Sequence, residues 1–320
     1  MPPVSACRSR ASAVTGPVVP PAVAEWAVRT TGCERIGRYT VQPLSGGTVS
    51  GSVERITLHM SGISGDADPA TREVQVVRKR AFPHEVAGLS AAQALRPAAT
   101  AIPELITWGR DQYGLWLITP FVAGVLLSDQ EAPANLFESL ARLHGHFHGA
   151  ADLPDELPRV DVRWWQQLCL EWVLPQIARH SDRHPLATIT RASAVVTDAA
   201  THGQTLTQLS PTLLHGDVHP GNVLIDGQSA WLIDWGSCRV GPAMLDLANL
   251  VALDSEEFAI YRRAWEESTE IPFDADQADL GYRWAALQIP IQYLPWMIEN
   301  LTTTEVETAL DRAEQALAAL

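Results

Sequence analysis

The chain has 320 residues, of which 46% are hydrophobic and 19% are charged, so it can bury a substantial core and is not broadly disordered. It contains no run of about eighteen apolar residues, which argues against a membrane-spanning helix. The net charge of −14 argues against nucleic acid and anionic membranes as partners; it suits a cationic ligand, but solubility explains it equally well. Four scattered cysteines without a Cys-x-x-Cys pair favour a reducing cytoplasm.

The first part of the chain is predicted to be rich in strands. Residues 1–22 lack an apolar signal segment and are interpreted as a disordered tail, as the product of a start codon placed too early, or as a transit peptide. Turn residues and β-favouring side chains predict strands in four regions: 38–60 (two strands around a glycine-rich turn), 73–79, 104–108 and 115–119. Pro83 is predicted to begin a helix.

The second part of the chain is predicted to be mostly helical. Apolar periodicity predicts helices at 135–148, 162–179 (with a kink at Pro175), 191–201 and over most of 243–318, around a hairpin within 212–236. The expected fold class is therefore α+β: a small β-rich N-lobe at 23–120 for nucleotide phosphates, and a larger helical C-lobe at 121–320 with the catalytic loop and the acceptor site.

The hairpin carries the most informative residues. Two apolar runs, 223–225 and 230–233, flank an Asp-Gly turn, which is a strong hairpin signal. If Ile225 pairs with Ala230, Asn222 comes to lie opposite Ile233.

Asp234 follows Ile233, and Asp217 lies on the loop that enters the same end of the hairpin. Two carboxylates and one amide oxygen therefore converge there. Phosphoryl transfer needs such a set, because a carboxylate must orient the acceptor hydroxyl and hard oxygen ligands must hold Mg²⁺ against the phosphates.

The segment from His215-Gly216-Asp217 to Asn222, followed by Ile233-Asp234-Trp235-Gly236, resembles the aminoglycoside phosphotransferase family, which is related to choline kinase and to protein kinases. The resemblance implies a two-lobed protein-kinase-like fold and transfer of the γ-phosphoryl group of ATP or GTP to a hydroxyl of a small molecule. It makes Asp217 the catalytic residue and Asn222 and Asp234 the Mg²⁺ ligands. It also implies that Asp246 braces the catalytic loop.

The resemblance extends to the N-lobe. Ser45, Gly46 and Gly47 look like part of the loop that covers the phosphates. Lys79, the only lysine among 23 basic residues, ends its strand where the family places the lysine that contacts the α- and β-phosphates. Arg78 would take this place if the register slipped by one residue.

Two further nucleotide contacts follow from the resemblance. Glu85 is the candidate partner of Lys79, although it follows Lys79 closely in the sequence. It also lies in the first turn of a helix, where the helix dipole favours an acid regardless of function. A functional and a purely structural role of Glu85 therefore both stay open. The backbone of Thr119, Phe121 and Val122 would bind the adenine edge.

Several alternatives remain. A catalytically inactive kinase-fold binding protein would keep the same fold, and a choline- or sugar-type metabolic kinase would keep the same chemistry. A protein kinase is disfavoured because Asp246 follows Gly236 too closely for an activation loop. A metallophosphoesterase is disfavoured because no histidine follows His219.

The acceptor stays open among amine-bearing molecules similar to an aminoglycoside or other antibiotics, choline, sugars and amino-acid derivatives. Acidic residues within 254–314 and the side chains of Trp284, Tyr293 and Trp296 are candidates for its pocket, although such acids more often form solvated helix faces and aromatic residues at helical spacing more often form core. The three histidines at 144–148 are expected to serve packing or lie in solvent instead of binding a metal. The oligomeric state stays open.

Overall fold

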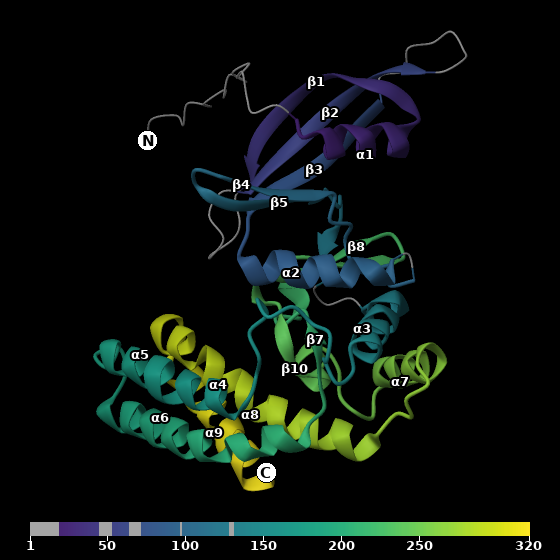
Figure 1. The fold of residues 1–320 in the computed structure, drawn as a ribbon. Helices are drawn as coiled ribbons and strands as arrows, with labels where there is room; N and C mark the ends of the chain where they lie inside the picture. The colour runs from purple at the N-terminus through teal and green to yellow at the C-terminus, as the bar shows by residue number, and fades with distance from the viewer. Residues whose placement is uncertain (1–18, 45–52, 64–71, 97, 128–130) are drawn as a thin grey trace, which may run out of the picture. The chain divides into compact units, whose positions relative to one another are not determined.

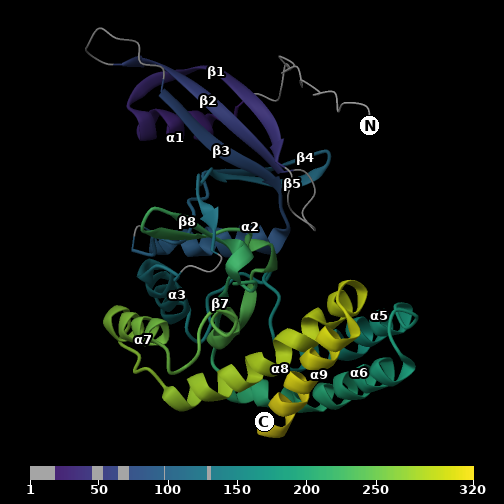
Figure 2. The same cartoon turned by 180° about the vertical axis from the view of Figure 1, so that it is seen from behind.

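The computed structural model describes residues 19–44, 53–63, 72–96, 98–127 and 131–320, and Figures 1 and 2 show the chain from two sides. The fold is mixed α+β. The chain divides into two compact units: the first contains the described residues up to Arg80 together with Leu105–Phe121, and the second contains Ala81–Glu104 and Val122–Leu320.

The first unit is built on one antiparallel sheet in the order β1-β2-β3-β5-β4. Its core lies between the sheet and α1, where Trp26 and Ala27 pack on Leu58, Met60 and Val76. The elements are α1 (Pro21–Thr31), β1 (Cys33–Leu44), β2 (Val53–Ile63), β3 (Arg72–Arg80), β4 (Thr107–Asp111) and β5 (Gly114–Pro120).

Helix α1 corrects the predicted tail, because Pro21 and Ala22 already belong to the helix; residues 1–18 lie outside the described part. The signals for this helix are present in the sequence. Proline occupies its first position, where no N–H donor is needed, and Gly32 ends it with a φ of 69°.

The second unit holds the remaining α-helices and five short strands in two small sheets. Its helices are α2 (Pro83–Ala92), α3 (Ala134–His146), α4 (Val162–Gln167), α5 (Leu174–Arg179), α6 (Leu186–Ala199), α7 (Glu256–Ser268), α8 (Ala275–Asn300) and α9 (Thr303–Ala319). The main core joins α4, α5, α6, α8 and α9, which gather together in both views. Trp165 and Trp284 meet edge to face at its centre, with ring centroids 4.9 Å apart.

Helix α2 packs with the second unit, whereas the sequence boundary assigned residues 81–104 to the first lobe. The contacts explain this placement. His84 Nε2 lies 2.8 Å from the backbone O of Gly236, and Leu232 N donates to Ala101 O at 2.8 Å. Gly88 faces Cys238 so closely that a Cβ at this position would collide with its sulfur.

The kink predicted at Pro175 takes the form of a change in helix type. Between α4 and α5 the chain makes a π-helical turn, Leu168–Val173, and Pro175 lies in the first turn of α5. A proline cannot donate to the preceding turn, and the wider π turn adapts the helix to this missing bond.

The short strands position the candidate site. The hairpin of β8 (Val223–Asp226) and β9 (Ser229–Leu232) has the predicted register, because Ile225 pairs with Ala230. The other strands, which the sequence did not predict, are β6 (Val125–Leu126), β7 (Pro211–Leu214) and β10 (Arg239–Pro242). Such short strands carry too few residues for an alternating pattern. None of the described helices is both long and apolar enough to cross a bilayer.

Candidate active site

The candidate catalytic loop begins where β7 ends, at His215-Gly216-Asp217. Gly216 has a φ of 85°, and a Cβ at this position would collide with the backbone O of Ser237. Only glycine avoids both the left-handed strain and this collision. The glycine that stands where protein kinases have arginine is therefore required by the local backbone.

Asp246 holds this loop from behind. Its carboxylate is fully buried and accepts hydrogen bonds from the backbone N of His215 (2.7 Å) and of Gly216 (2.8 Å). Burial alone would raise the pKa of Asp246, but the hydrogen bonds from His144 and from the Gly216 amide outweigh burial and lower that pKa. The contacts agree with the bracing role that the resemblance implies.

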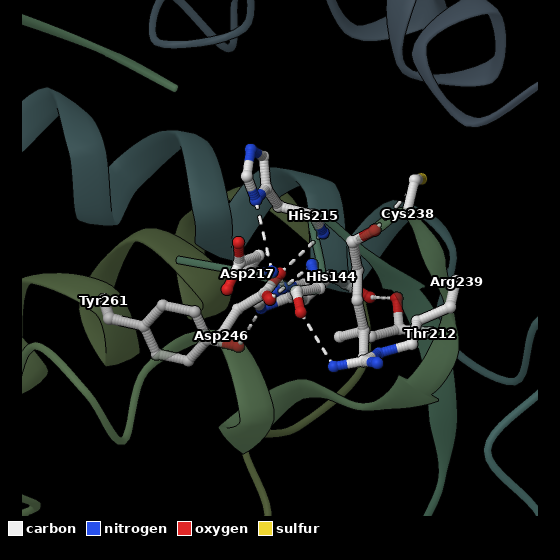
Figure 3. A network of polar contacts seen from close by, with 10 residues as sticks. His144, Thr212, His215, Asp217, Cys238, Arg239, Asp246 and Tyr261 are labelled. Carbon is white, nitrogen blue, oxygen red and sulfur yellow. Dashed lines mark hydrogen bonds and ion pairs between the residues drawn. The ribbon is translucent and has the colours of Figure 1, made fainter. Parts of the chain in front are cut away.

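A second layer of buried groups supports Asp246. His144 Nε2 lies 3.3 Å from Asp246 Oδ2, and its Nδ1 lies 3.0 Å from the hydroxyl of Tyr261. Because a carboxylate only accepts, His144 donates from Nε2 and accepts the Tyr261 proton at Nδ1. Figure 3 shows this chain of contacts from α7 through α3 to the catalytic loop.

His215 is held as a neutral ring. Its Nε2 lies 2.9 Å from the backbone O of Ile233, so that nitrogen carries the proton, and its Nδ1 accepts from Asp217 N at 3.4 Å. Burial lowers the pKa of His215 against the opposing charges of the nearby carboxylates. The ring therefore ties the loop to the strand end at Ile233 and adds no charge beside Asp217.

Both carboxylate oxygens of Asp217 are engaged. Asn222 Nδ2 donates to Oδ2 at 3.0 Å and to the Asp217 backbone O at 2.9 Å. The hydroxyl of Tyr293, on α8, donates to Oδ1 at 2.5 Å. The sequence offered Tyr293 only as an acceptor-stacking or core residue, and nothing in its local pattern indicates a contact with Asp217.

Asn222 and Asp234 lie at the same end of the hairpin, since Ile233 N donates to Asn222 O at 2.9 Å. Asn222 uses its amide nitrogen on Asp217, so its Oδ1 is the atom suited to a cation. Asp234 has a left-handed backbone with φ 60°, a conformation that asparagine and aspartate tolerate best among residues with a side chain.

This donor set fits magnesium. Within the described ranges, no group of three or more His, Cys, Asp or Glu side chains is placed to hold a metal ion. Mg²⁺ commonly takes one or two carboxylates and completes its shell with phosphate oxygens and water. One carboxylate and one amide oxygen are thus a sufficient share for a nucleotide-bound Mg²⁺, and insufficient for a permanent all-protein site.

Arg239, on β10, is a second residue that the sequence reasoning missed. Its Nη2 donates to the backbone O of Gly216 at 2.7 Å, and its guanidinium lies 5.7 Å from the ring centroid of Trp164. Burial lowers the pKa of this guanidinium, while the charges of Asp246 and Asp217 act to raise it. Arg239 therefore places a partly buried cation next to the candidate catalytic loop.

The candidate phosphate-binding residues of the first unit are only partly described. Ser45, Gly46 and Gly47 lie outside the described residues. Lys79 pairs with Val53 and Leu117 in the sheet. Arg78 is engaged on the other face of β3, where it bonds Asp111 at 3.0 Å and lies over the Trp116 ring. Because strand residues alternate in direction, Lys79 points away from that cluster.

The remaining candidates occupy different environments. Glu85 is buried in the first turn of α2, with only 1% of its surface exposed, which is unusual for an acid that merely complements a helix dipole. Phe121 N donates to Gln75 O at 2.9 Å, so this amide already serves the sheet. Thr119 pairs with Val77 in the sheet, and Val122 begins the next segment of the second unit.

The acidic region proposed for the acceptor is mostly solvated surface. Asp279 pairs with Arg283, Glu266 pairs with Arg262, and Asp274 caps α8. The three aromatic candidates for the acceptor pocket lie in different environments. Trp284 is fully buried, Trp296 is 56% exposed, and Tyr293 contacts Asp217.

Comparison with protein families places this chain in a known class. Residues 64–285 match the family model described as the phosphotransferase enzyme family (APH). The match covers most of the chain, including the catalytic loop and the hairpin. The chain therefore belongs to the phosphotransferase enzyme family, and it is a small-molecule kinase. No curated protein matches it in sequence.

Solved structures agree on the fold. A putative fructosamine-3-kinase from Thermobifida fusca is 20% identical, with 92% of this chain and 98% of that one covered and a TM-score of 0.55. The AMP-bound spectinomycin phosphotransferase APH(9)-Ia is 16% identical, with 92% and 97% covered and a TM-score of 0.52. A thermostable APH(4)-Ia variant with AMP-PNP and hygromycin B is 15% identical, with 93% and 98% covered and a TM-score of 0.51.

Proposed function

We propose that this protein transfers the γ-phosphoryl group of ATP or GTP to a hydroxyl of a small molecule, with Asp217 as the catalytic residue. The observation that carries the proposal is the hydrogen bond between Asn222 and Asp217, whose loop is braced by Asp246, at the end of the β8–β9 hairpin where Asp234 follows Ile233. The similar structures support the nucleotide, since they include complexes with ADP, AMP-PNP and GDP.

In this mechanism Asp217 accepts a hydrogen bond from the acceptor hydroxyl and orients its oxygen for in-line attack on the γ-phosphorus. Asn222 Oδ1 and Asp234 would hold Mg²⁺, which neutralises the charge of the phosphate oxygens when it is bound. Neutral His215 keeps the loop in place without adding a charge that would compete with the metal.

The nucleotide would be held mainly by residues that surround its phosphates and its base. Lys79 would neutralise the non-transferred phosphates, with Glu85 as its partner and with Ser45, Gly46 and Gly47 covering the phosphates. The backbone of Thr119, Phe121 and Val122 would meet the base. Since Phe121 N–H is engaged by Gln75, we expect other backbone groups of this segment to supply the donor.

The acceptor is proposed to be a hydroxyl-bearing small molecule, with amine-bearing compounds as the first class to test. The similar structures point to this range, since they include complexes with spectinomycin, hygromycin B and kanamycin and a putative fructosamine-3-kinase. The buried, unpaired thiols of Cys33, Cys169 and Cys238 suit the cytoplasm, which is the location we propose.

The test is NTP consumption with MgATP and MgGTP, over amine-bearing antibiotics, choline-like amines, sugars and ketosamines, with product mass to locate the new phosphate. Asp217→Asn is expected to lower turnover by about a hundredfold or more and to leave nucleotide affinity within about twofold. Asp226→Asn, on an exposed residue of the same hairpin, is the matched control and should stay active. Full turnover by Asp217→Asn would refute the assignment. Nucleotide binding with no turnover on any acceptor would favour the inactive binding protein.

A further inference from the structure

Tyr293 reaches the candidate catalytic carboxylate from a distant part of the chain. It lies in the last third of α8 and is half-buried, and its hydroxyl is 2.5 Å from Asp217 Oδ1. The other oxygen, Oδ2, accepts from Asn222 Nδ2 at 3.0 Å. Asp217 is therefore held by an amide on one oxygen and by a phenol on the other.

The phenol is a proton donor in this contact. A carboxylate only accepts, so the Tyr293 proton points to Oδ1. Burial and the charge of Asp217 raise the pKa of Tyr293, which keeps its hydroxyl protonated. The short distance is typical of a charge-assisted O–H···O⁻ bond.

An acceptor alcohol needs the same kind of contact. Its O–H must donate to the Asp217 carboxylate while its oxygen faces the γ-phosphorus. Oδ2 already accepts from Asn222 and has His219 Nε2 at 3.7 Å, so we assign the acceptor to the less crowded Oδ1, which the hydroxyl of Tyr293 now contacts.

We propose that Tyr293 is a positioning residue that occupies the acceptor's place on Asp217 Oδ1 until an acceptor displaces it, and that it thereby keeps water from acting as the nucleophile. This inference rests on the proposed function. Pro290 and Pro295 flank Tyr293 within α8. Neither residue can donate a helical hydrogen bond, so the turn around Tyr293 is less constrained than the rest of the helix.

The side reaction that Tyr293 would suppress is NTP hydrolysis. A water oxygen forms a new bond to the γ-phosphorus, and the bond between that phosphorus and the β,γ-bridging oxygen breaks with its electron pair, which leaves the nucleoside diphosphate. One water proton passes to Asp217 and then to solvent, and the products are the nucleoside diphosphate and inorganic phosphate.

The experiment uses water as the only nucleophile, so it needs no identified acceptor. Release of inorganic phosphate from MgATP and from MgGTP is measured for the wild type, Tyr293→Phe, Asp217→Asn and the double variant. Tyr282→Phe is the matched control, because Tyr282 is also half-buried on α8 and donates to a backbone oxygen, that of Val251, at 3.2 Å.

Tyr293→Phe keeps the ring and removes only the hydroxyl. We expect it to raise hydrolysis about tenfold, the factor that a charge-assisted hydrogen bond corresponds to, while Tyr282→Phe stays within about twofold of the wild type. Asp217→Asn in the same chain should abolish the increase. A purely structural role of Tyr293 would give equal or lower hydrolysis and a lower melting temperature.

Three outcomes would overturn the inference. The first is unchanged or lower hydrolysis by Tyr293→Phe at an unchanged melting temperature, while the wild type hydrolyses NTP in an Asp217-dependent way; this leaves the proposed function standing. The second is a phosphoryl group on Tyr293 of the wild type, found by peptide mass, since Tyr293 would then be an acceptor. The third is folded wild type and Tyr293→Phe that both bind nucleotide and both fail to hydrolyse it, which removes this inference and leaves the proposed function to the acceptor screen.

Discussion

Gly216 and Asp217 are adjacent in the candidate catalytic loop, and the structure restricts the backbone of the first and the side chain of the second. Gly216 needs a left-handed backbone and has no room for a Cβ beside Ser237 O. Asp217 needs its carboxylate held in one orientation, which Asn222 and Tyr293 provide from both sides. The first demand explains the glycine in this motif, and the second explains why a longer acid could not replace Asp217.

A comparison of Gly216 with Gly227 measures how much a steric clash of a Cβ at Gly216 lowers the free energy of unfolding. Gly216 and Gly227 both have positive φ, 85° and 61°, but a Cβ at Gly227 would meet nothing within 4 Å. We expect Gly227→Ala to lower the free energy of unfolding by about 1 kcal/mol, the cost of the left-handed backbone alone. Gly216→Ala should cost at least about 2 kcal/mol more, because backbone must move. Urea unfolding measures both, and equal losses would contradict the steric argument.

Residues of the candidate site were predictable where they share one short segment. Asp217, Asn222 and Asp234 lie within the hairpin and its entry loop, so their spacing reports their geometry, and the predicted register is confirmed. Tyr293 and Arg239 were not predictable, because their contacts depend on how α8 and β10 pack.

At the scale of elements, the catalytic loop is a meeting point of α3, α7 and the short 3₁₀ turn Ala243–Asp246. Each contributes one buried polar side chain: His144, Tyr261 and Asp246. Buried polar groups are costly unless every donor and acceptor is satisfied. The three side chains satisfy one another and the loop backbone, so the brace is stable only when all the elements are in place.

Asp246→Asn tests this brace. The amide would set an NH₂ group against the backbone donors of the loop, so we expect a loss of about 3 kcal/mol in the free energy of unfolding together with a clear fall in turnover. The control is Asp279→Asn, which removes an exposed pair with Arg283 and should cost less than about 0.5 kcal/mol. Chemical unfolding and NTP turnover measure the two effects. A variant as stable and active as the control would show that the brace is dispensable.

At the scale of the whole molecule, a buried histidine connects the site to global stability. Burial lowers the pKa of His215, and partial desolvation lowers the pKa of the exposed His148, which stands edge-on to the Trp265 ring. In the unfolded chain both rings regain a pKa near 6.5. As the pH falls through that value, these histidines bind protons in the unfolded state and stay neutral in the folded state.

The free energy of unfolding should therefore be constant above about pH 7 and fall as the pH drops from 6.5 toward 5. For His215 the slope is at most about 1.4 kcal/mol per pH unit, and for the exposed His148 solvent screening makes it smaller. The lowered pKa of Asp246 acts in a separate window, because its stabilisation is lost only below its ordinary value of 3.8. Urea unfolding at several pH values, with His148→Gln to isolate the part due to His215, measures the effect. Stability that rises on acidification to pH 5 would contradict it.

Local sequence alone was enough for the α+β class, the hairpin register and the loop that carries Asp217, because these depend on turn chemistry, alternation and spacing within a few residues. It was not enough for helix α1, for the placement of residues 81–104 with the helical unit, or for Tyr293 on Asp217. Those features are decided when elements far apart in the chain bury their surfaces against one another, and only the packed structure determines which side chains then meet.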